Sequence, residues 1–182
     1  MLEINMTREK KLIDTEFPKL EQLIQNPSDG LPEEVFEFVT TITPMVNVDL
    51  LIKNNEGRIL LSWRDDDYCG RGWHIPGGII RYKEKAEERV QKTAREELGS
   101  EVYNIKGPIE IHEVFTPQAI RGHFISFLYE CFLPSNYIIP KELVWDENKA
   151  KVGALMWHSK KPELVTGHKE IYAHLFQGED GQ

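Results

Sequence analysis

The sequence has few cysteines, and they are isolated from one another. Only Cys69 and Cys131 occur in 182 residues. Two such thiols have neither the spacing of a metal-ligand motif nor that of a disulfide framework. No neighbouring histidine marks either of them as an activated nucleophile, which argues against a catalytic thiol. We therefore expect two free thiols in a reducing compartment.

Long apolar runs and an excess of positive charge are also lacking. No apolar segment approaches the roughly 20 residues that a membrane-spanning helix requires. The first residues contain neither a basic cluster nor an apolar stretch, so nothing there is typical of a signal peptide. These absences predict a cytoplasmic protein with no membrane partner. The formal net charge of −8 argues against nucleic acid as the main partner, although a few Arg and Lys residues can still bind a small anionic diphosphate.

What the chain does contain is enough apolar material for one packed domain, since 40% of its residues are hydrophobic. We interpret residues 1–43 as a helical N-terminal extension and residues 44–182 as the main domain. Apolar residues recur at helical spacing over 8–26, where Pro18 could divide the helix in two. Pro32 opens a second short helix. The extension either caps the sheet or mediates a homodimer.

The main domain alternates β-rich segments with two helices. A strand over Met45–Ile52 leads through a turn at 54–57 into a second strand at 58–64. Later strands are expected at 109–115, His123–Phe132 and 155–157, and helices at 85–98 and 162–176. This order predicts an α/β sandwich with a mixed sheet.

The predicted helix at 85–98 carries two carboxylates in an unusual place. Ala86, Val90, Ala94 and Leu98 recur every four residues and form one apolar stripe, and Gly99 is a typical helix stop. Glu96 and Glu97 then lie near the helix C-terminus, where the helix dipole disfavours negative charge. Two interpretations follow. Either the acidic end is solvated and paired with nearby basic residues, or a compensating cation binds there.

The second interpretation would require oxygen ligands for a hard divalent ion. Mg²⁺ takes carboxylate and carbonyl oxygens together with substrate phosphate. The corner formed by Gly77 and Gly78 could bring backbone oxygen close to such an ion, because glycine allows close approach of the chain.

The spacing of these residues resembles the Nudix box. That pattern is Gly, five residues, Glu, seven residues, Arg-Glu, an aliphatic residue, any residue, Glu-Glu, any residue, Gly and a final aliphatic residue. The positions that fall in register are Gly78, Glu84, Ala94, Glu96, Glu97 and Gly99. The lead-in at 73–78 is similar as well, and the resemblance covers about residues 44–157. It implies a Nudix-type α/β/α sandwich and a hydrolase that uses Mg²⁺, or Mn²⁺, on a nucleoside diphosphate derivative.

Three positions depart from the box. Lys92 replaces the Arg, which keeps the charge that would pair with Glu84 but loses the bidentate fork. Ser100 replaces the final aliphatic residue. Thr93 replaces a Glu that commonly helps to bind metal in the family. We therefore expect this site to bind fewer metal ions than usual, down to a single ion. A box without that Glu resembles the GDP-mannose mannosyl hydrolase branch, as do residues 44–51 and 57–64.

The branch resemblance implies displacement of a nucleoside diphosphate from a sugar carbon, and it implies roles by position. Metal would be bound by the Gly77 carbonyl and Glu97, with Glu96 beside them. Substrate would be contacted by Arg64 and Lys92 at the diphosphate and by Asp49 on the nucleotide or sugar side. Apart from the resemblance, Arg71 lies near the glycine corner and could either touch phosphate or face solvent. Gly78, Glu84 and Gly99 would be structural.

The branch pattern weakens at two points. Ile79 stands where the branch has an Arg after its paired glycines. The branch also has a histidine base about five residues before a late Trp, but counting back from Trp157 leads to Val152. Asp146 and Glu147 are the nearest carboxylates, and either could activate water if a loop bends inward.

Two alternatives stay open at this stage. One is ordinary Nudix pyrophosphohydrolysis, in which water attacks phosphorus. The other is a catalytically weak Nudix domain that binds a nucleotide as a sensor. Thr93 and the missing histidine favour this alternative.

Overall fold

The structure is a computed structural model that describes residues 2–176, so the end of the expected 44–182 domain, 177–182, lies outside the described residues. Its helices are α1 (Leu2–Leu23), α2 (Glu33–Thr40), α3 (Ala86–Leu98) and α4 (Thr166–Tyr172), with short 3-10 turns η1 (Lys141–Leu143) and η2 (Ala173–Phe176). Its strands are β1 (Met45–Ile52), β2 (Ile59–Asp66), β3 (Gly70–His74), β4 (Gly77–Ile79), β5 (Tyr103–Phe115), β6 (His123–Phe132) and β7 (Leu155–His158).

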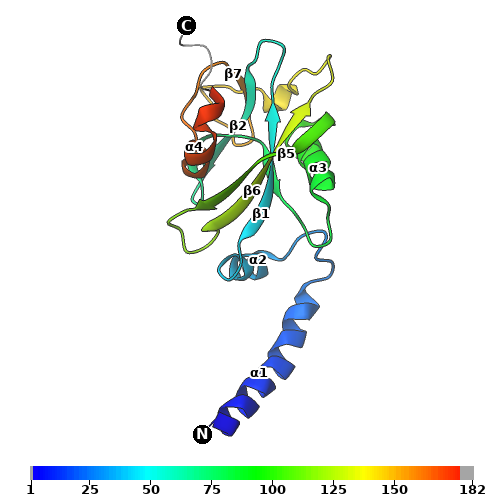
Figure 1. The fold of residues 1–182 in the computed structure, drawn as a ribbon, viewed down its shortest axis with the longest axis vertical. Coiled ribbons are helices and arrows are strands. Elements are labelled where there is room, and N and C mark those ends of the chain that lie inside the picture. Colours follow the sequence, from blue (N-terminus) through cyan, green and yellow to red (C-terminus); the bar gives the residue numbers. More distant parts are fainter. Residues whose placement is uncertain (1, 177–182) are drawn as a thin grey trace.

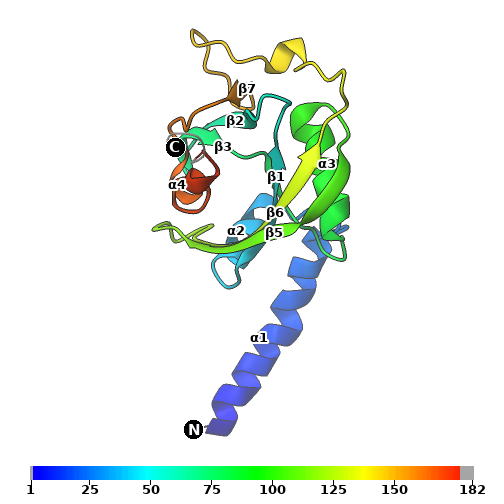
Figure 2. The same ribbon diagram turned by 45° about the horizontal axis from the view of Figure 1, so that its top comes forward.

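Two sheets form the body of the molecule. The four-stranded sheet has the order β4-β1-β6-β5, and the three-stranded sheet has the order β3-β2-β7. β1 and β6 run parallel, whereas the other neighbouring strands are antiparallel. Figure 2 shows α3 and α4 on opposite sides of the larger sheet. The predicted α/β/α sandwich with a mixed sheet is therefore confirmed.

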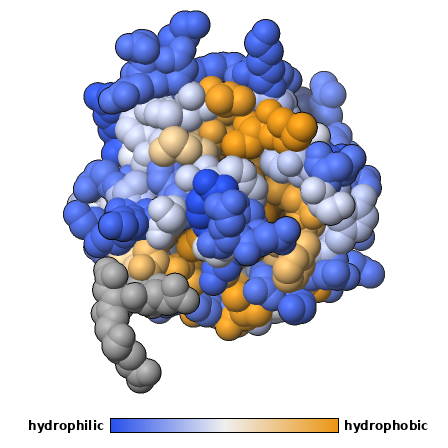
Figure 3. Space-filling view, turned by 90° about the horizontal axis from the view of Figure 1, so that it is seen from above, coloured by the Kyte–Doolittle hydropathy of each residue, from blue (hydrophilic) through white to orange (hydrophobic). Residues whose placement is uncertain are grey.

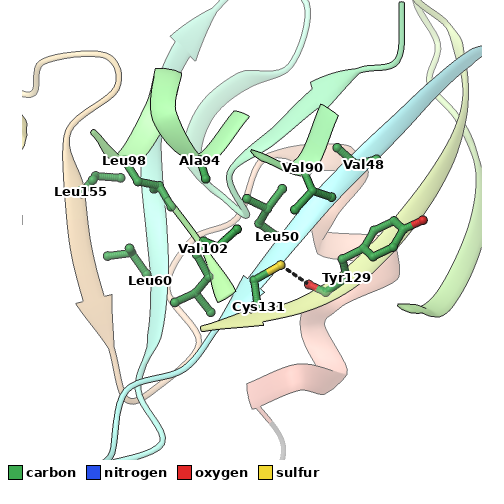
Figure 4. Packing of buried hydrophobic residues seen from close by; sticks show 11 residues of the cluster. Val48, Leu50, Leu60, Val90, Ala94, Leu98, Val102, Tyr129, Cys131 and Leu155 are labelled. Atoms are coloured by element: carbon green, nitrogen blue, oxygen red, sulfur yellow. Dashed lines mark hydrogen bonds between the residues drawn. The ribbon is translucent and has the colours of Figure 1, made fainter. Parts of the chain in front are cut away.

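The core joins α3 to the larger sheet, as the close view in Figure 4 shows. Val90, Ala94 and Leu98 are fully buried and pack with Leu50 of β1, which confirms the predicted stripe. Each large side chain buried in this way contributes about 1.5–3 kcal/mol relative to an exposed one. Cys131 lies in the same cluster, and its burial raises the pKa of the thiol to about 12. Such a thiol stays protonated, consistent with two free cysteines.

The N-terminal extension differs from what its sequence predicts. α1 continues through Pro18 as one helix of 22 residues, so the expectation of two pieces is wrong. Pro18 removes one backbone N–H donor, and the helical turns on both sides of it continue. Figure 1 shows α1 projecting away from the body, and Ile13 and Phe17 are 54% and 58% exposed. Of these two helices, α2 lies against the body, near the start of β1 and β6. The segment before α2 also contacts it, because Ser28 Oγ donates to the Tyr82 carbonyl at 3.1 Å.

Several boundaries in the main domain also shift. The strand expected at 109–115 begins at Tyr103, because its register with β6 continues past irregularities near Lys106. The helix expected over 162–176 begins at Thr166 and ends in the 3-10 turn η2. The second strand, expected at 58–64, begins at Ile59 and continues as β2 to Asp66.

Much of the molecular surface is hydrophilic (Figure 3), as expected for a chain in which 29% of the residues are charged. Seen from the end opposite α1, it is largely hydrophilic with separate hydrophobic patches (Figure 3). Within residues 2–176, no helix has both the length and the apolar character that crossing a bilayer requires.

Candidate active site

Two glycines let β4 lie directly against its neighbours. Gly77 is paired with Asp49 of β1, and a side chain at Gly77 would collide with the Asp49 carboxylate. A side chain at Gly78 would collide with the hydroxyl of Thr93 on α3 and reach within 3.0 Å of Arg89 Cδ. Because neither glycine has a Cβ, Asp49 of β1 and Thr93 of α3 can both pack closely against the Gly77-Gly78 corner.

Glu84 anchors the loop between that corner and α3. Its carboxylate accepts hydrogen bonds from Arg89 Nε at 2.8 Å, from Arg89 Nη2 at 3.1 Å and from the Arg81 backbone N–H at 2.9 Å. Lys92 Nζ adds an ion pair at 2.7 Å. Burial opposes ionisation, but the bonds from Arg89, Lys92 and the Arg81 backbone outweigh it and lower the pKa of Glu84 to about 2. Arg89 thus supplies the bidentate fork that the sequence lacks at position 92.

This arrangement predicts a pH-dependent contribution to stability. The pKa of Glu84 is about 2 in the folded protein and has a reference value of 4.5. Its contribution to folding, about 3 kcal/mol by linkage, is fully present above pH 4.5 and is lost as the pH falls toward 2. In urea unfolding, Glu84→Gln should therefore be least stable relative to wild type at pH 6, with the difference shrinking at pH 4.5 and further at pH 3.

The matched control is Glu101→Gln, which removes an exposed carboxylate 3.6 Å from Arg95. Its free energy of unfolding should be almost the same as that of wild type at every pH, since exposed ion pairs contribute little. A wild-type advantage over Glu84→Gln that does not change between pH 6 and pH 3 would contradict the assigned ionisation.

Glu97 is the carboxylate at the centre of the site. Its Oε2 is buried and has no hydrogen-bond partner among the described residues. Burial raises its pKa to about 7, the Arg64 guanidinium opposes that shift, and the nearby Asp49 carboxylate adds to it. A buried anion with a free oxygen and a second carboxylate nearby is a costly arrangement unless a cation completes it.

His74 lies next to Glu97 but does not neutralise it. Its Nε2 is 3.8 Å from Glu97 Oε2. Burial and the Arg64 guanidinium hold the pKa of His74 well below its ordinary value, so the ring is neutral at physiological pH. His74 and Glu97 therefore do not form an ion pair, and the negative charge of an ionised Glu97 is not neutralised by His74.

The residues at this corner fit a hard divalent cation. Glu97 offers an unpartnered carboxylate oxygen, and the Gly77 backbone is close enough to Glu97 to lower its pKa by hydrogen bonding. Across residues 2–176, no group of three His, Cys, Asp or Glu side chains forms a ready-made metal cage. Mg²⁺ does not need one, because it keeps several waters and uses one or two carboxylates together with substrate phosphates.

Asp49 and Arg64 flank the corner. Asp49 is buried, and its Oδ2 accepts hydrogen bonds from Tyr172 Oη at 2.7 Å and from Ser126 Oγ. These bonds join α4 to the larger sheet. Arg64 donates to Cys69 Sγ at 3.2 Å and lies 3.3 Å from Asp66, and it lines a pocket with His74 and Ser126. Arg64 is thus placed to meet an anionic ligand beside Glu97.

Other predicted site residues are exposed or are engaged with other side chains. The Glu96 side chain is 65% exposed and 3.6 Å from Arg89. Lys92 is engaged with Glu84. The Arg71 side chain is 67% exposed, with its nearest acidic partner, Asp65, at 3.9 Å, and it does not line the pocket beside Arg64.

The two candidate bases are also outside that pocket. Asp146 lies after η1 and accepts the Asn148 backbone N–H at 3.0 Å. It faces a separate shallow depression lined by lysines, and Glu147 next to it is exposed. The preceding Trp145 packs its ring within 4.9 Å of the Trp73 ring. The structure therefore does not bring this pair of carboxylates to Glu97.

Three residues at the site were missed by sequence reasoning. His74 precedes the glycine corner, so its position before Gly77 could have marked it. Arg89 lies five residues after Glu84, in the first turn of the predicted helix, and this position could have suggested that its side chain reaches Glu84. His168 on α4 had no local signal, because it reaches the site only through the fold, where its Nδ1 accepts the Ile75 backbone N–H at 3.1 Å.

Comparison with known proteins decides the family. A sequence profile of the NUDIX domain matches residues 43–175. The chain belongs to the NUDIX family. The predicted Nudix family is thereby confirmed, and residues 1–42 precede the matched region.

Solved structures show a similar fold. The fold is similar to a MutT NUDIX hydrolase from Burkholderia pseudomallei (TM-score 0.56, 21% identity, 71% of this chain and 95% of that chain). It is also similar to a NUDIX hydrolase from Nitrosomonas europaea (TM-score 0.50, 15% identity, 64% and 72%).

A curated relative is the low-salt glycan biosynthesis protein Agl8 of Haloferax volcanii. It is 33% identical over 76 residues, 42% of this chain. The match spans about half (48%) of the length of that relative.

Proposed function

We propose that this NUDIX protein is a hydrolase that uses a divalent cation to cleave a nucleoside-diphosphate-linked substrate, a nucleotide sugar of the GDP-mannose kind. The observation that carries the proposal is the buried, unpartnered Glu97 oxygen beside the Gly77-Gly78 corner. Glu97, the Gly77 carbonyl and Glu96 would hold Mg²⁺ or Mn²⁺. When bound, the ion would neutralise charge on the departing diphosphate.

The residues around the cation site support a single-ion arrangement. Thr93 is buried, and its hydroxyl packs against Gly78, so the position that commonly carries a second carboxylate offers none. Arg64 would hold the diphosphate, and the buried Asp49 would order the adjoining substrate side through Ser126 and Tyr172. A role for Asp146 or Glu147 as base stays a prediction that requires their loop to move.

A nucleotide sugar is favoured over other diphosphate compounds by two considerations. The box resembles the mannosyl hydrolase branch at Thr93, where a metal-binding Glu is replaced. The name of the Haloferax relative places that protein in glycan biosynthesis. We propose a small-molecule substrate accordingly, and an intracellular setting in which such a substrate occurs.

The bond that is cleaved can be read from the products. Hydrolysis of GDP-mannose in ¹⁸O-water with Mg²⁺ should place the label in mannose, because a single cation suffices to stabilise a leaving diphosphate while water attacks carbon. Mass spectrometry of both products gives the position of the label. Label in a phosphate product would instead establish attack at phosphorus, and binding without turnover across a panel of nucleotide sugars would indicate a nucleotide sensor.

A further inference from the structure

The pocket beside Arg64 contains acceptor atoms that the protein leaves unused. Its wall includes Arg64 and His74, and His74 lies beside Glu97 of the proposed cation site. Gln118 and Asn47 also line it, and Gln118 Oε1 and Asn47 Oδ1 are buried with no hydrogen-bond partner among the described residues. Buried polar atoms nearly always have a partner, so these oxygens indicate donors on a ligand.

The orientation of Gln118 is set by its other end. Gln118 Nε2 donates to the backbone carbonyl of Tyr68 at 2.8 Å. Only the amide nitrogen of a glutamine can donate to a carbonyl, which fixes which end of the group is the oxygen. The end of the amide that has no partner is therefore the acceptor oxygen, and it belongs to a residue of the pocket wall.

We propose that Gln118 is a specificity-determining residue, whose Oε1 accepts a hydrogen bond from an N–H or O–H of the substrate beyond its diphosphate, and that helix α2 positions it. The inference rests on the proposed function, since it assumes a nucleotide-sugar substrate in this pocket. The donor is either an amino group of the base or a hydroxyl of the sugar, and the two sources are separated below.

The connection from α2 to Gln118 passes through Tyr68. The Tyr68 hydroxyl donates to Glu37 Oε1 of α2 at 2.8 Å, and the Tyr68 carbonyl holds Gln118. Tyr68 itself lines the pocket. Movement of Tyr68 would thus move both a pocket wall and the acceptor that Gln118 presents.

Arg121 makes a second connection between α2 and the pocket rim. Its guanidinium lies 4.2 Å from the centroid of the Tyr68 ring and 4.8 Å from that of the Phe36 ring on α2, which are favourable cation–π distances. The Arg121 backbone N–H donates to Thr40 Oγ1 at 3.3 Å. α2 therefore contacts both loops that frame this side of the pocket.

His168 of α4 adds a donor to the lining of the same pocket. Its Nδ1 accepts the Ile75 backbone N–H, and burial lowers its pKa, so the neutral ring carries its proton on Nε2. None of the described acceptors takes that proton, and His168 lines the pocket. His168 thus adds a donor to the two acceptors, Gln118 Oε1 and Asn47 Oδ1.

The first test replaces the recognition group. Gln118→Met keeps the length of the side chain and removes the acceptor together with the hydrogen bond to the Tyr68 carbonyl, and the substrate analogues below isolate the acceptor. We expect KM for GDP-mannose to rise about tenfold with kcat nearly unchanged, because one lost hydrogen bond to bound substrate weakens ground and transition states alike. Unchanged KM and kcat would overturn the assignment.

Substrate analogues then identify the donor. IDP-mannose lacks the 2-amino group of guanine, so a base donor predicts that wild type discriminates against it and that Gln118→Met loses the discrimination. A sugar donor predicts the same pattern for a deoxymannose analogue of GDP-mannose. Discrimination retained by Gln118→Met for every analogue would overturn the role of Gln118.

The second test addresses positioning by α2. Glu37→Ala and Tyr68→Phe should each raise KM for GDP-mannose several-fold, and the double variant should be no worse than either, because both remove one interaction. Glu37→Gln should restore a low KM, since its amide oxygen still accepts from Tyr68. Glu34→Ala on the same helix, where the side chain is exposed, is the matched control. Additive effects, or an equal effect of Glu34→Ala, would overturn positioning through Tyr68.

Failure of the underlying function can be told apart from failure of this inference. If wild type hydrolyses no nucleotide sugar with Mg²⁺, the proposed function fails. In that case, the affinity for GDP-mannose in Mg²⁺, measured by calorimetry, tests Gln118 separately from catalysis. Binding about tenfold weaker by Gln118→Met than by wild type supports the inference. Equal affinity of the two proteins, or no binding by wild type, overturns it.

Discussion

Glu97→Gln should lower kcat for nucleotide-sugar hydrolysis by at least about 100-fold, the upper end of what removal of an outer-shell metal partner costs. Glu97 is expected to bind the cation directly, so its loss should cost no less. Glutamine keeps the size of the side chain but removes the charge that holds the ion. Steady-state kinetics over a range of Mg²⁺ concentrations would measure the effect, and the concentration of Mg²⁺ needed for half-maximal rate should rise.

The neighbouring carboxylates provide the comparison for Glu97. Glu96→Gln tests the other expected metal ligand, whose side chain is largely exposed, and we expect a smaller loss than for Glu97→Gln. Glu101→Gln removes an exposed carboxylate beyond the end of α3 and should leave kcat unchanged. Equal activity of wild type and Glu97→Gln would contradict the proposed cation site, provided that circular dichroism shows both to be folded.

Arg89→Met should lower the free energy of unfolding by about 3 kcal/mol, the lower end of the cost of breaking a buried ion pair. Arg89 makes two of the hydrogen bonds to Glu84, and the side chains of both residues are less than 10% exposed. Lys92 remains as a partner for Glu84, which is why the larger values for such pairs are not expected. Urea unfolding at pH 7 would measure the loss.

Two further variants test the reason for that loss. Arg95→Met removes an arginine from the same helix, where its pair with Glu101 is half exposed, and should cost less than about 1 kcal/mol. Adding Glu84→Gln to Arg89→Met should recover part of the stability, because it removes the buried charge that Arg89 leaves behind. A strictly additive double variant would show that Arg89 acts through packing and not through Glu84.

The helix that carries the site could be predicted well from local patterns. The four-residue spacing of Val90, Ala94 and Leu98 reports directly on burial, because one face of a helix repeats at that period. Glu97 was conspicuous for the opposite reason: a carboxylate beside an apolar stripe at the negative end of a helix has no local stabilisation. The regular repeat and the exception to it were both visible in the sequence.

Contacts between distant segments could not be predicted in the same way. Asp49 and Tyr172 are 123 residues apart in the chain, and Gln118 and Tyr68 are 50 apart. No periodicity connects such pairs, because their approach depends on the order of strands in the sheet and on loop conformation. The position of Asp146 outside the pocket has the same origin, since counting residues back from a Trp assumes a loop path that this chain does not follow.

By itself, the sequence determined the family pattern, the buried stripe of α3 and the carboxylate at Glu97, all of which are encoded in spacings within one segment. Only the tertiary structure decided that Arg89 supplies the fork to Glu84, that His74 is a neutral neighbour of Glu97, and that α2 contacts the rim of the pocket. The physical reason is burial: the charge state of Glu97 and His74 and the free oxygen of Gln118 depend on what surrounds them, and only the packed fold sets those surroundings.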